Sequence, residues 1–431
     1  LAGLISFLFS ASPVSAHAFG KLYNLPVPFW LYLYGGAAAI IVSFLIIGYF
    51  VNQTKKSLIF PNRDISSLVF VAVLKNSLSK IVLKSLVLFL FVLAVLTGIF
   101  GVNTSYANFN MTFFWIIFVL GTTYLCAIVG NVWNLVNPWK TLAELFEFMS
   151  SRPLRGYIDY PQKFAYYQEL LFYFIFILIE LTVKATPFDL SFFIIDYTAL
   201  TFGAVFLFGK ENWFAKGEFF SVLFGLISKV APLEYSAKKV YLRAPFVGLL
   251  KDSAQDFSQL LFILFMLSST AFDGFRSTLP WRNIYTAVFK SQMSSWGDSL
   301  DKIVQTASLL ISPLLFLAIY LILLVVMKIL VRSNLSLKDL ALKFAFSLIP
   351  IALVYNVAHY YTLLLIQGQD IIRLASDPFG FGWNLFKTAN FSPNIRLIDA
   401  NFVWHSQVAL ILIGHIAAVY LAHLVAINLF T

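Results

Sequence analysis

Histidines and carboxylates interrupt several long apolar runs of this chain, and their chemistry needs an explanation. An ionisable group held within a bilayer is costly, so each is a hypothesis for a functional site. The deep candidates are Glu180, Asp196, Asn356, His359, His415 and His423. Candidates at the ends of the apolar runs are His17, Asp273, Asp377 and His405.

The depth of these groups follows from a helical rise of roughly 1.5 Å per residue. His359 and Asp196 then lie roughly 10 Å from the outer ends of their helices, and His415 lies roughly 15 Å from His405. Asn356 shares a helix face with His359 because it precedes it by one turn. We therefore expect His359 and His415 to face each other or a shared cavity in the outer half, with Asp196 nearby.

Three functional uses of this set stay open, besides one structural use. Two neutral imidazoles could hold a haem iron, and imidazole with carboxylate could hold a divalent metal. The same groups could relay protons or bind a solute in a transporter. In the structural alternative, each histidine makes one interhelical hydrogen bond and no site exists.

The start of the chain predicts a signal peptide over residues 1–16. A short apolar stretch is followed by Val14-Ser15-Ala16, with small residues at the −3 and −1 positions of a cleavage site. Cleavage would make His17 the mature N-terminus, whose amine and imidazole could chelate copper. His405, Asp273 or Asp377 would complete that site; otherwise His17 is incidental.

The composition sets the class of protein. Of 431 residues, 60% are hydrophobic and 12% are charged, whereas a soluble domain is about 25% charged. This excludes a soluble enzyme, a disordered chain and a fibrous repeat, and it favours an all-α polytopic membrane protein. The net charge of +10 is spread over many loops, which argues against a nucleic-acid partner. The partner predicted by composition is the lipid bilayer.

About nine spans are predicted within one transmembrane domain, residues 17–431. Each is long enough for a hydrocarbon core of roughly 30 Å. The predicted limits are 29–50, 85–102, 112–133, 165–183, 190–208, 257–272, 305–327, 344–366 and 405–429. Two apolar segments, Ile65 to Leu74 and Phe219 to Val230, are too short to span and are expected to lie at the interface as amphipathic helices.

The distribution of basic residues predicts the orientation. With the N-terminus outside, the inside segments 51–84, 134–164, 209–256 and 328–343 hold 21 of the 30 Lys and Arg. Lys and Arg favour the cytoplasmic side of a membrane. We therefore expect an N-out, C-in topology in a bacterial inner membrane.

Two further motifs have both structural and functional interpretations. Gly130 to Trp139 (GNVWNLVNPW) is expected to cap a helix end, with tryptophans as interfacial anchors. Ser376 to Trp383 (SDPFGFGW) predicts a structural turn, with a lid over the site as the alternative. The sequence contains no Gly-rich phosphate loop, H-E-x-x-H, C-x-x-C or G-x-S-x-G motif.

A family resemblance is carried by several segments. They read AHAFGKLYNLPVPFWLYLYGGAAA, KGEFFSVLFGLISKVAPL, AFDGFRST, SLIPIALVYNVAHYYTLLLIQGQ, SDPFGFGWNLF and VWHSQVALILIGHIAAVYLAH. Together they resemble a group of bacterial multipass proteins often labelled fenitrothion hydrolase. That label implies hydrolysis of an organophosphorus ester, which usually needs a metal-activated water. Members of the group often carry His at the position of Asn356 and an acid at that of Leu424.

The leading functional expectation is a membrane protein that binds a metal, haem or small solute in an outer-half His/Asp pocket, for transport or membrane redox chemistry. The alternatives are a membrane-bound hydrolase of the resembled kind and a structural or assembly subunit. Whether the protein is an enzyme, which cofactor it binds and its oligomeric state stay open at this point.

Overall fold

The long apolar runs form helices of membrane-crossing length in a computed structural model. The structure describes residues 60–68, 76–183, 185–236, 239–289 and 293–430, with single positions between 34 and 71. Seven described helices are long and apolar enough to cross a membrane. They are Ser77–Phe100, Phe109–Val129, Pro187–Phe208, Phe257–Arg276, Ser299–Val331, Leu337–Ser376 and Ala400–Phe430. The predicted all-α multi-pass fold is confirmed.

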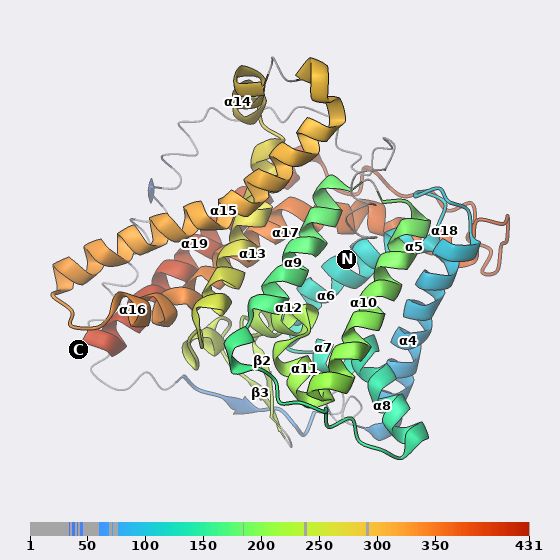
Figure 1. Ribbon diagram of the computed structural model, residues 1–431, viewed down its shortest axis with the longest axis horizontal. Coiled ribbons are helices and arrows are strands. Elements are labelled where there is room, and N and C mark those ends of the chain that lie inside the picture. The colour runs from blue at the N-terminus through green and yellow to red at the C-terminus, as the bar shows by residue number, and fades with distance from the viewer. Residues whose placement is uncertain are drawn as a thin grey trace.

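The transmembrane helices and their extensions carry the labels of Figure 1. They are α4 (Ser77–Phe100), α5 (Phe109–Met111), η1 (Thr112–Leu120), α6 (Gly121–Val129), α9 (Tyr167–Thr182), α10 (Pro187–Phe208), α13 (Phe257–Arg276), α15 (Met293–Val331), α16 (Leu337–Phe344), η4 (Ala345–Leu348), α17 (Ile349–Ile366), η5 (Gln367–Gln369), α18 (Asp370–Ser376) and α19 (Ala400–Phe430). α9 has 16 residues and corresponds to the predicted span 165–183. Most of the predicted span 29–50, like residues 1–16, lies outside the described residues.

Helix α13 lies at the centre of the bundle and packs against α9, α15 and α17 (Figure 1). Every residue of α13 from Phe262 to Thr270 is buried. In contrast, α15 exposes Ile311, Leu314, Ile319 and Ile322. An exposed apolar face of this extent would be costly in water, so it is the surface that meets lipid.

Close packing of α4 and α10 depends on Gly98. A Cβ at this position would lie 2.0 Å from Ser191 Oγ and 2.4 Å from the Pro187 carbonyl oxygen. The small residues let the two backbones approach, as is usual between membrane helices. Asn110 stabilises this contact, because its Nδ2 donates a hydrogen bond to the Pro187 carbonyl at 2.7 Å.

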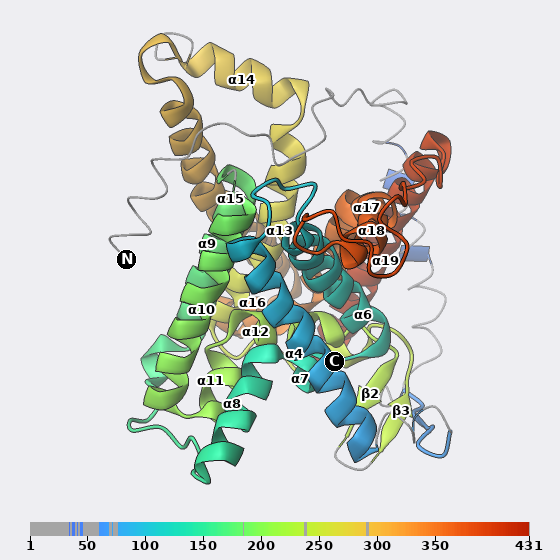
Figure 2. The same cartoon turned by 90° about the vertical axis from the view of Figure 1, so that its right-hand side faces the viewer.

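Short elements gather at one end of the bundle, opposite α14 (Leu279–Phe289) and α18 (Figure 2). They are α7 (Trp133–Val136), α8 (Pro138–Ser150), η2 (Gln162–Phe164), α11 (Lys210–Lys216), η3 (Val247–Leu250) and the strands β1 (Arg63–Asp64), β2 (Leu233–Tyr235) and β3 (Val240–Leu242). The strands form an antiparallel sheet in the order β1-β3-β2. Arg63 pairs with Leu242, which also pairs with Leu233.

The four segments predicted to be cytoplasmic meet at this end. Lys84 Nζ lies 2.5 Å from Glu144 Oε2, and Lys210 Nζ lies 2.6 Å from Glu147 Oε2. The Ala254 amide donates to the Leu342 carbonyl at 3.2 Å. These contacts make the four segments neighbours, as the charge count requires. We call this the predicted cytoplasmic end and the opposite one the predicted outer end, since the orientation itself stays a prediction.

The prediction of an interfacial helix at 219–230 is wrong. Helix α12 (Phe219–Ser228) is buried on nearly every face and packs against α6 and α9. A helix that is apolar all round has no polar face to present to a headgroup layer, so it enters the interior. Trp133 and Trp139 are likewise 1% exposed. They pack on Phe220 inside the bundle, which corrects the expectation of interfacial anchors.

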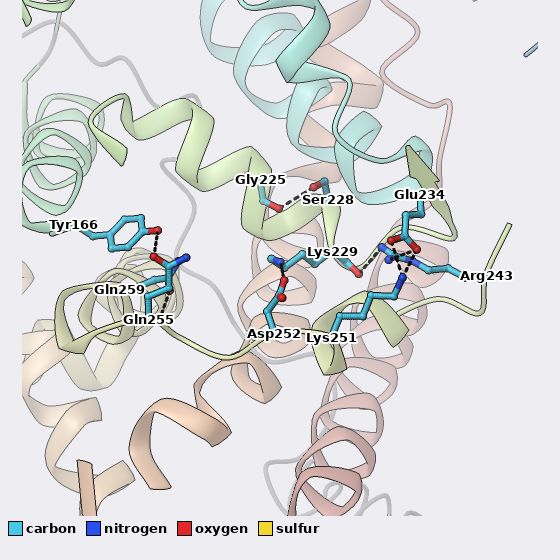
Figure 3. A network of polar contacts seen from close by, with 10 residues as sticks. All are labelled: Tyr166, Gly225, Ser228, Lys229, Glu234, Arg243, Lys251, Asp252, Gln255 and Gln259. Carbon is cyan, nitrogen blue, oxygen red and sulfur yellow. Dashed lines mark hydrogen bonds and ion pairs between the residues drawn. The ribbon is translucent and has the colours of Figure 1, made fainter. Parts of the chain in front are cut away.

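Arg243 ties the end of α12 to the sheet (Figure 3). Its guanidinium donates to the carbonyls of Ala231 and Lys229 at 3.1 and 3.2 Å and lies 3.1 Å from Glu234 Oε2. Burial alone would raise the pKa of Glu234, but Lys251 and Arg243 outweigh it and lower that pKa. This polar layer fixes the position of α12 at the predicted cytoplasmic end.

Candidate functional site

Asp273 is the buried centre of a polar cluster in the last turn of α13. Its side chain is 3% exposed. Oδ2 accepts a hydrogen bond from the Tyr360 hydroxyl at 2.8 Å and lies 2.8 Å from Nε2 of His359. Oδ1 accepts from Arg276 Nε at 2.8 Å. We call Asp273, Arg276, His359 and Tyr360 the Asp273 cluster.

The position of the cluster follows from the helices that carry it. Asp273 and Arg276 are three apart, so they share one face of α13, and a basic residue is favoured at a helix C-terminus. Arg276 also donates to the Leu181 carbonyl at 2.9 Å and to Gln305 Oε1 at 2.8 Å. Because Tyr360 comes from α17, the cluster joins four spans near the predicted outer end.

A cavity of about 710 Å³ lies beside this cluster. Pockets of about 300–1,000 Å³ are typical of small-molecule sites. The wall is formed largely by η1, α9, α13 and α17, with α12 at its deepest point. Its polar and aromatic lining residues are Asn103, Thr104, Ser105, Tyr106, Thr112, Trp115, Thr123, Tyr173, Phe176, Glu180, Thr186, Ser269, Thr270, Asn356, Tyr360, Gln367 and Asp370.

The lining residues place the two ends of the cavity. Residues 103–106, Gln367 and Asp370 belong to the connections at the predicted outer end. Leu223 and Ile227 of α12 line the opposite end. Beyond them lie α12 itself and the polar layer of Figure 3. The cavity therefore occupies the half of the bundle that faces the predicted outer end.

Helix η1 supplies much of one wall. It is a π-helix of nine residues within the second described span. Its Thr112, Trp115 and Ile116 line the cavity. Wider helical turns of this kind are uncommon and occur frequently at functional sites.

Glu180 and Tyr360 connect the Asp273 cluster to the cavity. Both side chains line it, whereas Asp273 and His359 do not. The His359 side chain is 34% exposed. Glu180 is within electrostatic range of Asp273, Arg276 and His359. Asn356, one turn before Tyr360 on α17, also lines the cavity. Its buried Oδ1 has no hydrogen-bond partner among the described residues, so it is an acceptor open to a ligand or water.

The predicted meeting of His359 with His415 has no contact to support it. His359 bonds to Asp273, while His415 Nδ1 lies 2.7 Å from the Ile411 carbonyl of its own helix. His405 makes the same kind of contact with Asn401 O at 2.7 Å and is exposed. The buried Nε2 of His423 has no partner among the described residues. His405 and His415 are therefore held by carbonyls of their own helix, and none of the three histidines of α19 contacts the Asp273 cluster.

The expectation that Asp196 lies near His359 is corrected by the packing of α10. Asp196 is exposed and does not line the cavity. The packed face of α10 includes Leu190 and Ile194. Asp196 follows Ile194 by two residues, which is about 200° around a helix. The two residues therefore face opposite sides of α10.

The remaining candidates have structural positions or lie outside the described residues. Asp377 accepts hydrogen bonds from the amides of Phe381 at 2.9 Å and Gly382 at 2.7 Å. The same segment is anchored to the residue after α4 and Gly101, because the Phe379 carbonyl accepts a hydrogen bond from the Val102 amide at 2.8 Å. The preferred prediction of a structural turn at 376–383 agrees with these bonds. His17 lies outside the described residues.

The expected metal or haem site gains no ligand cluster. No group of three or more His, Cys, Asp or Glu side chains in the described part of the chain could hold a metal ion. Sequence reasoning overlooked Arg276 and Tyr360, although the i, i+3 pair in AFDGFR and the tyrosine next to His359 were visible signals.

Comparison of the chain with protein-family models, curated proteins and solved structures finds no match.

Proposed function

We propose that this chain binds a small solute in the outer half of a membrane-spanning bundle, in the service of transport across that membrane. The observation that carries the proposal is the cavity of about 710 Å³ beside the Asp273 cluster. Its size suits a small molecule, and its polar groups are set among aromatic and aliphatic side chains, as in small-molecule sites.

The ionisable groups near the cavity support the same function. Polar side chains at membrane depth that face the bundle interior commonly mark solute or ion pathways. Glu180, Asn356 and Tyr360 come from two different spans and share this cavity. Transporter sites typically lie between helices near the middle of the membrane. No described feature favours the hydrolase alternative over this reading.

The proposal predicts that water-soluble reagents reach the cavity wall from outside the cell. Thr270 and Ser268 are a matched pair on α13, since Thr270 lines the cavity while Ser268 faces α15 and accepts from Ser312 Oγ at 3.2 Å. Each is replaced by cysteine in a Cys126→Ala background. A charged, membrane-impermeant methanethiosulfonate should modify Thr270→Cys in intact cells and leave Ser268→Cys unmodified. Protection of both cysteines, or faster reaction of Ser268→Cys, would contradict a water-filled cavity.

A further inference from the structure

The charge of the cavity wall points to the class of solute. Among the described residues that line the cavity, Glu180 and Asp370 are carboxylates and none is Lys, Arg or His. Asp370 is already paired with Arg373, whose Nη2 lies 3.0 Å from its Oδ1. Asp273, which does not line the cavity, is paired with Arg276. Among the described residues, Glu180 is therefore the lining carboxylate without an ion-pair partner.

The hydrogen-bonding groups of the cavity wall also favour a ligand that carries positive charge or hydrogen-bond donors. Glu180 presents a carboxylate, and Asn356 has a buried amide oxygen that no described donor reaches. Both are acceptors. A buried acceptor or charge without a partner costs free energy, so a ligand that supplies hydrogen-bond donors or positive charge removes that cost. An anion would be repelled by the Glu180 carboxylate, since the nearby Arg276 is already paired with Asp273.

Aromatic side chains complete the pattern. Trp115, Tyr173 and Phe176 line the cavity together with Tyr106 and Tyr360. Aromatic faces attract cations, most strongly where water is excluded. The aliphatic lining, which includes Ile116, Val119 and Leu353, suits an apolar body attached to the charged group.

We propose that the solute is a small organic cation with an apolar body, held with its positive group at Glu180. This inference rests on the proposed function and names its substrate class. Glu180 is the specificity-determining residue, because its carboxylate attracts a cation but not a neutral or anionic solute of the same shape.

The test uses three probes of similar shape and different charge. They are benzyltrimethylammonium, phenylmethanesulfonate and N,N-dimethylbenzamide. Each is titrated against modification of Thr270→Cys by neutral N-ethylmaleimide in the full-length protein with Cys126→Ala. The cation should protect the cysteine with at least about a tenfold advantage over the other two probes, because its fixed positive charge is attracted to the Glu180 carboxylate and to the aromatic faces of the wall.

Substitutions at Glu180 separate charge from shape. Glu180→Gln keeps the size of the side chain and should weaken protection by the cation about tenfold, because it removes the charge that attracts the cation, whereas Glu180→Asp should retain it. Glu211→Gln is the matched control, because the Glu211 side chain is 83% exposed at the predicted cytoplasmic end and does not line the cavity, and it should leave protection by the cation unchanged. An unchanged titration in Glu180→Gln would overturn the assignment.

The outcomes distinguish this inference from the proposed function. Equal or better protection by the sulfonate or the amide would overturn the cation class while leaving a solute cavity. Modification of Thr270→Cys that no probe slows would overturn the inference as well. Failure of any reagent to reach Thr270→Cys would overturn the proposed function itself.

Discussion

Replacement of Glu218 by alanine should lower the free energy of unfolding by at least about 4 kcal/mol, because several buried donors lose their acceptor at about 1–3 kcal/mol each. Glu218 is fully buried and caps the N-terminus of α12. Its carboxylate accepts from Tyr197 Oη at 2.6 Å, Ser221 Oγ at 2.7 Å and Asn137 Nδ2 at 3.1 Å. It also accepts from the amides of Phe220 and Ser221.

Unfolding of the Glu218→Ala variant in mixed detergent–dodecyl sulfate micelles measures this loss. Glu218→Gln keeps one carbonyl acceptor and should fall between the wild type and Glu218→Ala. The exposed Glu211, whose side chain is 83% exposed, provides the control, since Glu211→Ala should change the free energy by less than about 0.5 kcal/mol. A Glu218→Ala protein as stable as the control would show that this network does not hold α12.

Replacement of Asp273 by asparagine should cost about 3 kcal/mol, which is the lower end of the range for breaking a buried ion pair. The neutral amide would leave the Arg276 guanidinium without its carboxylate at 2.8 Å and weaken the contacts with His359 and Tyr360. The expected result is a large loss of unfolding free energy in the same micelle titration, together with loosening of the cavity wall next to α17.

A double variant shows whether charge is the cause. Removal of both charges in Asp273→Asn with Arg276→Gln should restore part of the stability, because neither member of this ion pair is then left without its partner. The exposed Asp159 is the matched control for an aspartate-to-asparagine change. If Asp273→Asn were no less stable than Asp159→Asn, the Asp273 cluster would not be a structural element of the wall.

The spans could be predicted from the sequence because the thickness of a bilayer dictates the length of an apolar helix. The gathering of the basic segments at one end could be predicted for the same reason, since their positions follow from the number of crossings. The burial of α12 could not be predicted from its length. It depends on the neighbouring helices, which enclose an element that hydropathy alone assigns to the interface.

The sequence predicts how deep in the membrane each candidate residue lies, but not the direction in which its side chain points. The position of a residue along its helix gives its depth, so Glu180 and Asn356 were recognised and do line the cavity. The direction in which a side chain points depends on which helices pack together. Asp196 therefore faces away although its predicted depth matches that of His359. Asp273 lies at a helix end in the sequence, and only the packing of α17 against α13 makes it the centre of a cluster.

The sidedness of the cavity tests the central claim most directly. The measurement is the modification rate of Thr270→Cys, in the Cys126→Ala background, by a charged methanethiosulfonate in right-side-out and in inside-out membrane vesicles. We predict modification in right-side-out vesicles and protection in inside-out vesicles, because the cavity reaches residues 103–106 at the predicted outer end and meets α12 at the other. Faster modification in inside-out vesicles would contradict this account of an outward-facing solute site.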